Sequence, residues 1–439
     1  MAYSNYFILL SAFLLIILSQ TSSAQPSFRP KALVLPATKD SSTGQYVAEV
    51  KQRTPLVPVK VTIDLGGQYL WVDCEQGYVS STYKPSRCRS AQCSLANSQA
   101  CGDCFSGPKP GCNNDTCGLS PDNTIIRLGT SGELAQDVLA LESTNGNNPG
   151  RVVSVPNLLF TCAPTFLLEG LASGVKGMAG LGKSKIGLPS QLASAFSFKR
   201  KFAICLSSSK GVIFFGDGPY NFLPNHDLSS GLTYVPLLTN PVSTAGSYFE
   251  GESSVEYFIG VKSIRVNNAD VPLNTTLLKI SSDGFGGTKI SNVDKYMTLE
   301  PSIYKAVTDA FVKAASNVPR VNAVAPFRIC YNSKNFLSTR LGLNVPLIEL
   351  VLQSSSVSWQ IYGANSMVDV GNGVVCLGIL DGSLVNPNTN IVRTSVVIGA
   401  HQIEDNLLQF DLAASRLGFS SLLYGQRTTC GNFNFTSVA

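Results

Sequence analysis

Histidine is nearly absent from this 439-residue chain, and so are the short motifs of common hydrolases. Neither His226 nor His401 stands beside a nucleophile signature, and both are interpreted as polar surface residues. The sequence has no Gly-x-Ser-x-Gly motif, no phosphate-binding loop and no histidine cluster with metal-ligand spacing. These absences argue against serine-hydrolase, nucleotide-dependent and metal-dependent chemistry, and no cofactor is expected.

Charged residues are scarce as well, at 14% of the chain, and they form no strong cluster. The longest basic run is only Lys199-Arg200-Lys201, and no aromatic stacking pattern accompanies the net charge of +5. Nucleic acid is therefore not an expected partner. The thin positive excess predicts no more than a mild, unspecific attraction to acidic polysaccharide.

Beyond the N-terminus, no apolar run is long enough to span a membrane. Residues 7–18 are almost wholly apolar but too short for a bilayer, and the small residues Ser22, Ser23 and Ala24 follow them as a cleavage pattern. No Lys or Arg precedes the run, which departs from the usual signal-peptide pattern. Residues 1–24 are interpreted as a signal peptide rather than a buried helix. The mature chain is expected to be a soluble, secreted monomer with no membrane contact.

Cysteine, in contrast, is abundant, and an exported chain is expected to pair it. The motif Cys101-x2-Cys104 could suggest a zinc site. However, an even number of cysteines in an oxidising compartment favours disulfides, so six bridges and no free thiol are predicted. The twelve residues are Cys74, Cys88, Cys93, Cys101, Cys104, Cys112, Cys117, Cys162, Cys205, Cys330, Cys376 and Cys430.

Three Asn-x-Thr sequons agree with secretion. They predict N-glycosylation at Asn114, Asn274 and Asn434.

Short strand-like runs dominate the rest of the chain, and helical patterns are few. Residues 188–196 and 301–315 have the apolar spacing of helices. Two strand-rich halves with one helix each predict a duplicated, mostly-β protein, with one lobe at 25–235 and the other at 236–439. The predicted strands are 59–63, 69–72, 152–155, 158–160, 212–215, 257–261, 263–266, 347–352, 374–379 and 394–398.

Four motifs in chain order resemble those of the pepsin-like aspartic proteases. The segment TIDLGGQYLWV (residues 62–72) resembles the strand–turn–strand that carries the first catalytic Asp of that family. This resemblance implies a bilobal pepsin-like fold, with the Cys-rich insertion in the first lobe. The other three motifs are SGEL (131–134), GMAGLG (177–182), and VIGA (397–400) continuing through FDL (410–412) to RLGF (416–419).

The catalytic residues of that family are not all present. Aspartic proteases need two carboxylates that share one proton. Asp64 remains, but Leu65 stands at the family's Thr position, and Ser291 stands where the second Asp is expected. Asp294 lies three residues too late, and the flap segment 126–129 lacks the family's Tyr. Losing one member of a catalytic set commonly costs about 10⁴–10⁶ in rate, so an inactive, catalytically degenerate homologue is predicted.

Four further segments narrow the resemblance: KALVLPATKD (31–40), QRTPLV (52–57), DLGGQYLWVDC (64–74) and FAICLSS (202–208). They resemble segments of the plant apoplastic glycanase inhibitors. These include the xyloglucan-specific endoglucanase inhibitor and extracellular dermal glycoprotein group and, more distantly, the basic 7S globulins and wheat xylanase inhibitors. The resemblance implies a protein secreted into the plant cell wall that binds microbial endoglucanases of glycoside hydrolase family 12 in defence.

The same resemblance implies a binding site and part of the disulfide pairing. In that family two loops of the C-terminal lobe supply inhibitory arginines, which correspond to Arg320 in residues 317–326 and Arg393 in residues 386–393. A guanidinium is suited to the paired carboxylates of a glycosidase. The implied bridges are Cys74–Cys162, Cys205–Cys430 and Cys330–Cys376, with the Cys88–Cys117 cluster pairing internally.

Two other functions remain open at this point. One is a storage or peptide-binding globulin of the 7S type with no enzyme partner, and the other is a weakly active aspartic protease.

Overall fold

β-Strands form most of the regular structure in the computed structural model, which describes residues 28–224, 226–244, 251–352, 356–385 and 392–438. The predicted signal peptide, residues 1–24, lies outside these ranges. The described residues from Lys31 onward form one compact unit. Across the described ranges, no helix is both long and apolar enough to cross a membrane.

The same four-strand arrangement occurs twice in this unit. In the first half, β12 (Gly177–Gly180) is parallel to β3 (Val57–Asp64) and antiparallel to β4 (Leu70–Asp73). β11 (Pro149–Ala163) then pairs in parallel with β4. This repeat confirms the predicted duplicated, mostly-β architecture. The matching strands of the second half are β32 (Val396–Ile398), β21 (Thr288–Ile290), β22 (Met297–Leu299) and β31 (Ile379–Asp381).

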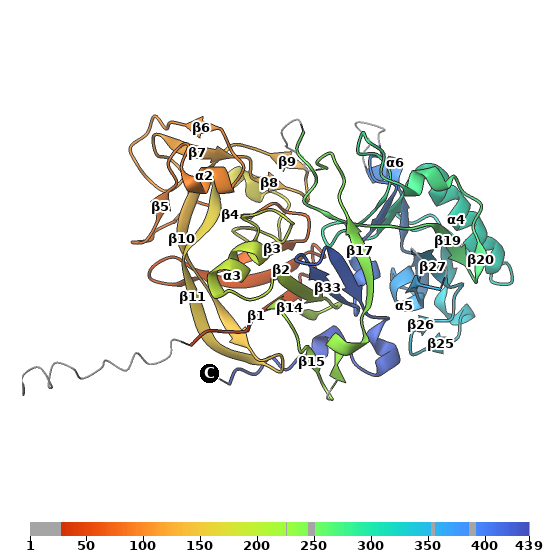
Figure 1. Cartoon of the computed structure of the whole chain (residues 1–439). Helices are drawn as coiled ribbons and strands as arrows, with labels where there is room; N and C mark the ends of the chain where they lie inside the picture. Colours follow the sequence, from red (N-terminus) through yellow and green to blue (C-terminus); the bar gives the residue numbers. More distant parts are fainter. Residues whose placement is uncertain (1–27, 225, 245–250, 353–355, 386–391, 439) are drawn as a thin grey trace, which may run out of the picture. The chain divides into compact units, whose positions relative to one another are not determined.

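An antiparallel sheet joins the two halves, with three strands from each. β13 (Lys201–Cys205) pairs with β33 (Leu407–Asp411), so the sheet is continuous across the junction. In Figure 1 this sheet lies in the middle of the folded body, between the region of β10 and β11 and the region of α4 and β19. The lobe boundary predicted between residues 235 and 236 falls inside one of its strands, β17. The other strands are β1 (Ala32–Lys39), β14 (Lys210–Gly216), β34 (Arg416–Phe419) and β17 (Thr233–Leu238).

Aromatic side chains fill the core beneath this sheet. The Phe202 and Phe410 rings stack with centroids 4.8 Å apart, and the Tyr257 ring lies 4.3 Å from that of Phe410. Tyr257 begins β18 (Tyr257–Ile259) and donates its hydroxyl to the Leu181 carbonyl at 2.6 Å. Each such ring pair adds roughly 0.5–1.5 kcal/mol beyond area burial, so the two halves share one stabilising core.

Both predicted helices are present. Residues 188–196 form α3 (Leu188–Phe196), and residues 301–315 form α4 (Pro301–Ala314), which ends one residue earlier than predicted. Glu300 caps α4 by accepting hydrogen bonds from the Ser302 and Ile303 amides. The remaining α-helices of the described residues are short: α2 (Ala91–Leu95), α5 (Gly363–Ser366), α6 (Gly382–Val385) and α7 (Ala400–Ile403).

All twelve cysteines form disulfides, so no thiolate remains for the zinc alternative. The three long-range bridges are those that the resemblance implied, and the cluster pairs internally. The bridges are Cys74–Cys162, Cys205–Cys430, Cys330–Cys376, Cys88–Cys101, Cys93–Cys117 and Cys104–Cys112.

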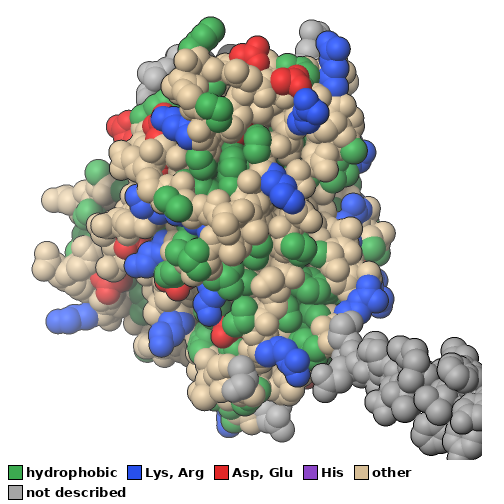
Figure 2. Space-filling view, turned by 90° about the vertical axis from the view of Figure 1, so that its left-hand side faces the viewer, with side chains coloured by type: hydrophobic (Ala, Val, Ile, Leu, Met, Phe, Trp, Pro, Cys, Tyr) green, Lys and Arg blue, Asp and Glu red, His purple; other side chains and the backbone are tan. Residues whose placement is uncertain are grey.

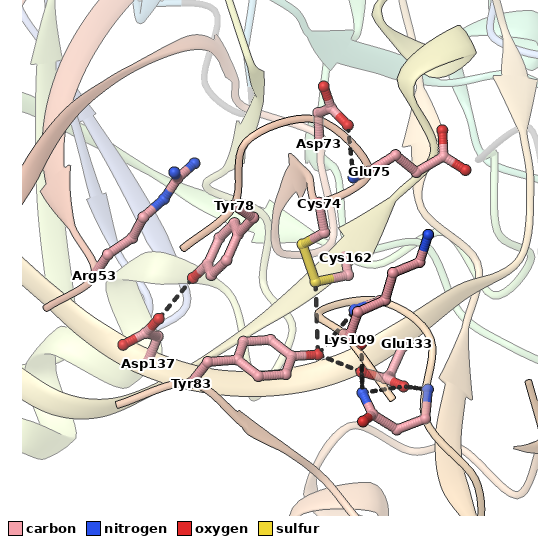
Figure 3. Close-up of a disulfide and its surroundings, with 12 residues drawn as sticks. Arg53, Asp73, Cys74, Glu75, Tyr78, Tyr83, Lys109, Glu133, Asp137 and Cys162 are labelled. Carbon is pink, nitrogen blue, oxygen red and sulfur yellow. Dashed lines mark hydrogen bonds between the residues drawn. A yellow bond between two sulfur atoms is a disulfide. The ribbon is translucent and has the colours of Figure 1, made fainter. Parts of the chain in front are cut away.

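The Cys-rich segment is fastened to the body beside the Cys74–Cys162 bridge (Figure 3). Gly111 packs against this disulfide at a φ of +80°, where an added Cβ would lie 3.2 Å from Cys162 Cβ. The Gly111 amide donates to the Tyr83 hydroxyl at 3.1 Å, and that hydroxyl donates to Glu133. The Asn113 amide also donates to Glu133, at 2.9 Å. The segment is thus cross-linked internally by its disulfides and joined to the body here by polar contacts.

Candidate functional site

Asp64 ends β3 at the junction of the two halves, and its residue is only 2% exposed. Its Oδ1 accepts a hydrogen bond from the Gly66 amide at 2.8 Å, and its Oδ2 accepts one from Thr124 Oγ1 at 2.7 Å. The turn needs small residues, because a Cβ on Gly67 would lie 2.9 Å from the Gly180 Cα. The motif therefore places one carboxyl group at a tight, well-defined turn.

Burial raises the pKa of Asp64 to about 6. The negative charges of Glu256 and Asp122 add to this rise, while the hydrogen bonds from Thr124 and Gly66 oppose it. Asp64 is therefore a carboxyl group that titrates in mildly acidic solution.

Ser291 occupies the equivalent position in the second half. In the first half β12 pairs Ala179 with Ile63, the residue before Asp64, and in the second half β32 pairs Ile398 with Ile290, the residue before Ser291. The Ser291 amide donates to the Ile398 carbonyl at 2.9 Å. Its Oγ accepts from the Asp294 amide at 3.1 Å, so the hydroxyl closes its own turn.

Asn292 links the two turns, a role that the sequence did not reveal. Its Oδ1 accepts from the Leu65 amide at 2.7 Å, and its Nδ2 donates to the Ile63 carbonyl at 2.8 Å. Asn292 is 3% exposed, so these bonds are shielded from water. Leu65, at the matching place in the first turn, has no polar side-chain atom. The tie between the turns therefore comes from one side only.

A second carboxylate reaches the first turn from a different direction. A Cβ on Gly66 would lie 3.1 Å from Glu256 Oε1 and 3.5 Å from Asp64 Oδ1, which places Glu256 beside that turn. Lys289 Nζ pairs with Glu256 Oε1 at 2.7 Å. Burial lowers the pKa of Lys289, but the Glu256 carboxylate outweighs it and holds the pKa above its ordinary value. The cleft floor thus contains an ion pair between the two turns.

These groups line a cleft with a volume of about 430 Å³. Asp64 and Ser291 lie on its lining, together with Arg127. Arg127 belongs to the predicted flap, which forms the hairpin of β8 (Asp122–Asn123) and β9 (Leu128–Gly129). The flap therefore presents an arginine to the cleft, and its segment 126–129 contains no tyrosine.

The two predicted partner-binding arginines lie in different places. Arg393 lines the cleft, is exposed, and places its guanidinium carbon 5.7 Å from the centroid of the Phe285 ring. Residues 386–391 of its loop lie outside the described residues. Arg320 begins β23 (Arg320–Val321) and lines a separate groove along α4. Both side chains are exposed, but they do not share one lining.

Comparison with known proteins identifies the family. The chain matches the xylanase inhibitor N-terminal model over residues 46–217 and the xylanase inhibitor C-terminal model over residues 256–421. It is 62% identical over 431 residues to the probable aspartic proteinase GIP2 of Nicotiana benthamiana, covering 97% of both chains. The chain belongs to the xylanase inhibitor-type family.

Solved structures of this family agree. The crystal structure of edgp matches with a TM-score of 0.91 and 62% identity, covering 94% of this chain and all of that one. The basic 7S globulin of soybean matches with a TM-score of 0.78 and 39% identity, covering 93% of this chain and all of that one. The pepsin-like fold is confirmed, and the chain is a non-classical member of that fold.

The link through Asn292 predicts a specific loss of stability. Asn292→Ala leaves the buried Leu65 N–H and Ile63 C=O without partners, which is expected to cost about 2–4 kcal/mol of unfolding free energy. Urea unfolding measures the loss, and hydrogen exchange of the Leu65 amide locates it.

The matched control is Asn240→Ala. Asn240 is also buried and bonds to the Gly284 carbonyl and the Val242 amide, away from the two turns. Both variants should lose stability, but only Asn292→Ala should accelerate exchange at Leu65. An unchanged Leu65 amide would contradict the link.

The raised pKa of Asp64 predicts a pH-dependent stability difference. Because the folded-state pKa lies above the unfolded value, this carboxyl group's contribution is fully present below about pH 4 and is lost as the pH rises through about 6. Asp64→Asn removes the titration, so the variant should match the parent at pH 4 and exceed its stability by about 2–3 kcal/mol at pH 7.5.

Thermal unfolding at the two pH values measures this difference. Asp283→Asn, at an exposed position, is the control and should show no such dependence. An equal effect of Asp64→Asn at both pH values would contradict the assignment.

Proposed function

We propose that this protein is a secreted inhibitor of microbial glycoside hydrolases. Its targets are proposed to be xyloglucan-specific endo-β-1,4-glucanases of glycoside hydrolase family 12, met in the plant apoplast during defence. The observation that carries the proposal is that inhibitor-type domains cover both halves of the chain. Residues 1–24 would be removed as a signal peptide, leaving a monomer with lobes at 25–235 and 236–439.

The chemistry of the cleft supports a role without proteolysis. An aspartic protease activates water between two carboxylates that share a proton. Here the position equivalent to Asp64 is Ser291, whose hydroxyl accepts a hydrogen bond from the Asp294 amide within its own turn. The nearby Glu256 carboxylate is neutralised by Lys289. We infer that the fold has kept its frame and lost the catalytic pair.

Exposed arginines on a rigid body suit the proposed target. A retaining glycosidase holds two carboxyl groups about 5–5.5 Å apart in an open cleft, and a guanidinium can bridge such a pair. Arg320 and Arg393 are both exposed, and the backbone of each is held by a contact to a neighbouring segment. The Arg320 strand pairs with β24 (Cys330–Asn332), and the Arg393 carbonyl accepts from the Gly286 amide at 2.7 Å.

The covalent features agree with secretion. Six disulfides suit an oxidising compartment. Asn114 and Asn274 are exposed and Asn434 is half-buried, so the proposed glycosylation sites lie at or near the surface.

A second candidate function is a 7S-type storage or peptide-binding globulin without an enzyme partner. It is favoured by the 39% identity to the basic 7S globulin of soybean over 446 residues, covering 99% of both chains. A cleft of about 430 Å³ has room for a short peptide segment. This candidate predicts no hydrolase inhibition.

An inhibition assay tests the leading proposal. Arg320→Ala and Arg393→Ala should each weaken inhibition of a susceptible family 12 endoglucanase about thirty-fold, because an anchor arginine typically contributes 2 kcal/mol or more. Lys at either position should rescue only partly, since an ammonium cannot span two carboxylates.

Arg340→Ala is the control, because Arg340 is also exposed and forms no ion pair among the described residues. If both alanine variants inhibit as strongly as the parent protein, Arg320 and Arg393 are wrongly assigned as the inhibitory residues. A parent protein that inhibits nothing across a panel of family 11 and family 12 enzymes would overturn the function itself.

The proposed loss of proteolytic activity gives a separate prediction. The purified protein should not cleave denatured globin at acid pH, and Asp64→Ala should leave hydrolase inhibition intact, because Asp64 lacks a partner carboxylate at Ser291. Pepstatin-sensitive cleavage that disappears in Asp64→Ala would instead show an active protease.

A further inference from the structure

A second concavity, separate from the cleft, collects basic side chains. It is a groove with a volume of about 380 Å³ along α4, and Lys313, Arg320 and Arg328 lie on its lining. α4 contributes Lys313, while the segment around β23 and β24 contributes the two arginines. Figure 1 shows α4 at the outer edge of the second half. The cations therefore come from two segments that the fold brings together.

These cations are not neutralised within the described residues. None of Lys313, Arg320 and Arg328 forms an ion pair there, and the one acid on the lining, Asp309, pairs with Lys305 at 2.6 Å. Asp381 lies near Tyr304 but is not among the residues that line the groove. The groove is left with an excess of positive charge.

The shape of the groove favours an extended ligand. Its helical wall runs from Tyr304 to Lys313, ten residues of α4, whose nine steps along the helix correspond to about 13.5 Å. The lining also contains the polar residues Tyr304 and Thr308 and the apolar residues Val312 and Ile329. The Thr308 hydroxyl donates to the Tyr304 carbonyl within α4 at 2.7 Å. A fitting ligand would therefore combine repeated negative charge, hydrogen-bonding groups and apolar C–H faces in one chain.

We propose that this groove binds an acidic oligosaccharide, an extended chain of hexuronic acid residues. Each sugar of such a chain carries one carboxylate for a guanidinium or ammonium, hydroxyls for polar partners, and a C–H face for the apolar wall. A single carboxylate on a protein ligand would need only one of the three cations, whereas a chain of acidic sugars offers a carboxylate for each. The groove shares Arg320 with the proposed hydrolase-binding site, whereas Lys313 and Arg328 belong only to the groove and can test this inference separately.

The local concentration of charge distinguishes this groove from the face of the molecule shown in Figure 2. The net charge is only +5, and on the face shown in Figure 2 the Lys and Arg side chains are scattered rather than gathered in one field. When positive charge is spread over a surface, its attraction for an anion is unspecific, and every exposed cation contributes about equally. A specific site in the groove predicts instead that Lys313, Arg320 and Arg328 contribute most of the affinity.

Isothermal titration of the full protein with a de-esterified oligogalacturonide at low ionic strength tests the proposal. The same oligomer in fully methyl-esterified form, which is neutral, is the matched ligand control. Lys313→Gln and Arg328→Gln should each weaken binding of the acidic oligomer roughly five-fold, the size expected for a partly exposed charge contact. Arg340→Gln removes the same charge elsewhere and should leave binding unchanged.

Three results would overturn the proposal. The first is equal binding of the esterified oligomer, which would remove the role of the carboxylates. The second is an equal loss in Arg340→Gln, which would show unspecific attraction. The third is an oligoglutamate peptide that binds as tightly and is weakened by the same variants, which would reassign the groove to acidic protein.

Discussion

Near the cleft floor, the side chain of Asn292 bonds to the backbone of the opposite turn, and the geometry of the site depends on that contact. An amide is well suited to this task because one group both donates and accepts. These two bonds join the Ser291 turn to the Asp64 turn, and both turns line the cleft. The central sheet and the Phe202–Phe410 stack then hold the two halves in the same relation.

This arrangement separates the frame of the fold from its chemistry. The tie between the turns persists although Leu65 contributes no polar atom and Ser291 no carboxylate. Beside these turns, Glu256 and Lys289 form an ion pair. The Glu256 carboxylate is therefore paired with a cation and does not act as the partner carboxylate of Asp64. On the proposed function, selection would preserve a rigid body and exposed loops rather than groups that transfer protons. This structure has such a body and such loops.

The sequence predicted the repeated elements better than their extent. The two longer helices follow from apolar spacing and a Pro near each start, which are local signals. In contrast, β11 was predicted as two runs, 152–155 and 158–160, because Pro156 and Asn157 between them resemble a break. The structure continues the strand through an irregularity in its pairing with β10 (Gly132–Thr144) at this point. Tertiary pairing overrides local propensity there.

In the candidate site, too, residues within a local motif could be predicted, whereas contacts set by the fold could not. Asp64 and Ser291 could be located because a family motif surrounds each. Asn292, Glu256 and Lys289 could not be assigned roles, because their contacts are set by the fold. Leu65 and Asn292 lie 227 residues apart in sequence, and no local pattern records such a pairing. Arg320 was named from a resemblance, whereas its companions Lys313 and Arg328 emerge only when α4 packs beside β23.

On the proposed function, this pepsin-like protein binds a hydrolase rather than cleaving a peptide. Size-exclusion chromatography with light scattering on a mixture of the protein and a family 12 xyloglucan endoglucanase tests this directly. We expect a one-to-one complex in which the endoglucanase stays intact and loses its activity. Two separate peaks at every mixing ratio, with full endoglucanase activity, would contradict it.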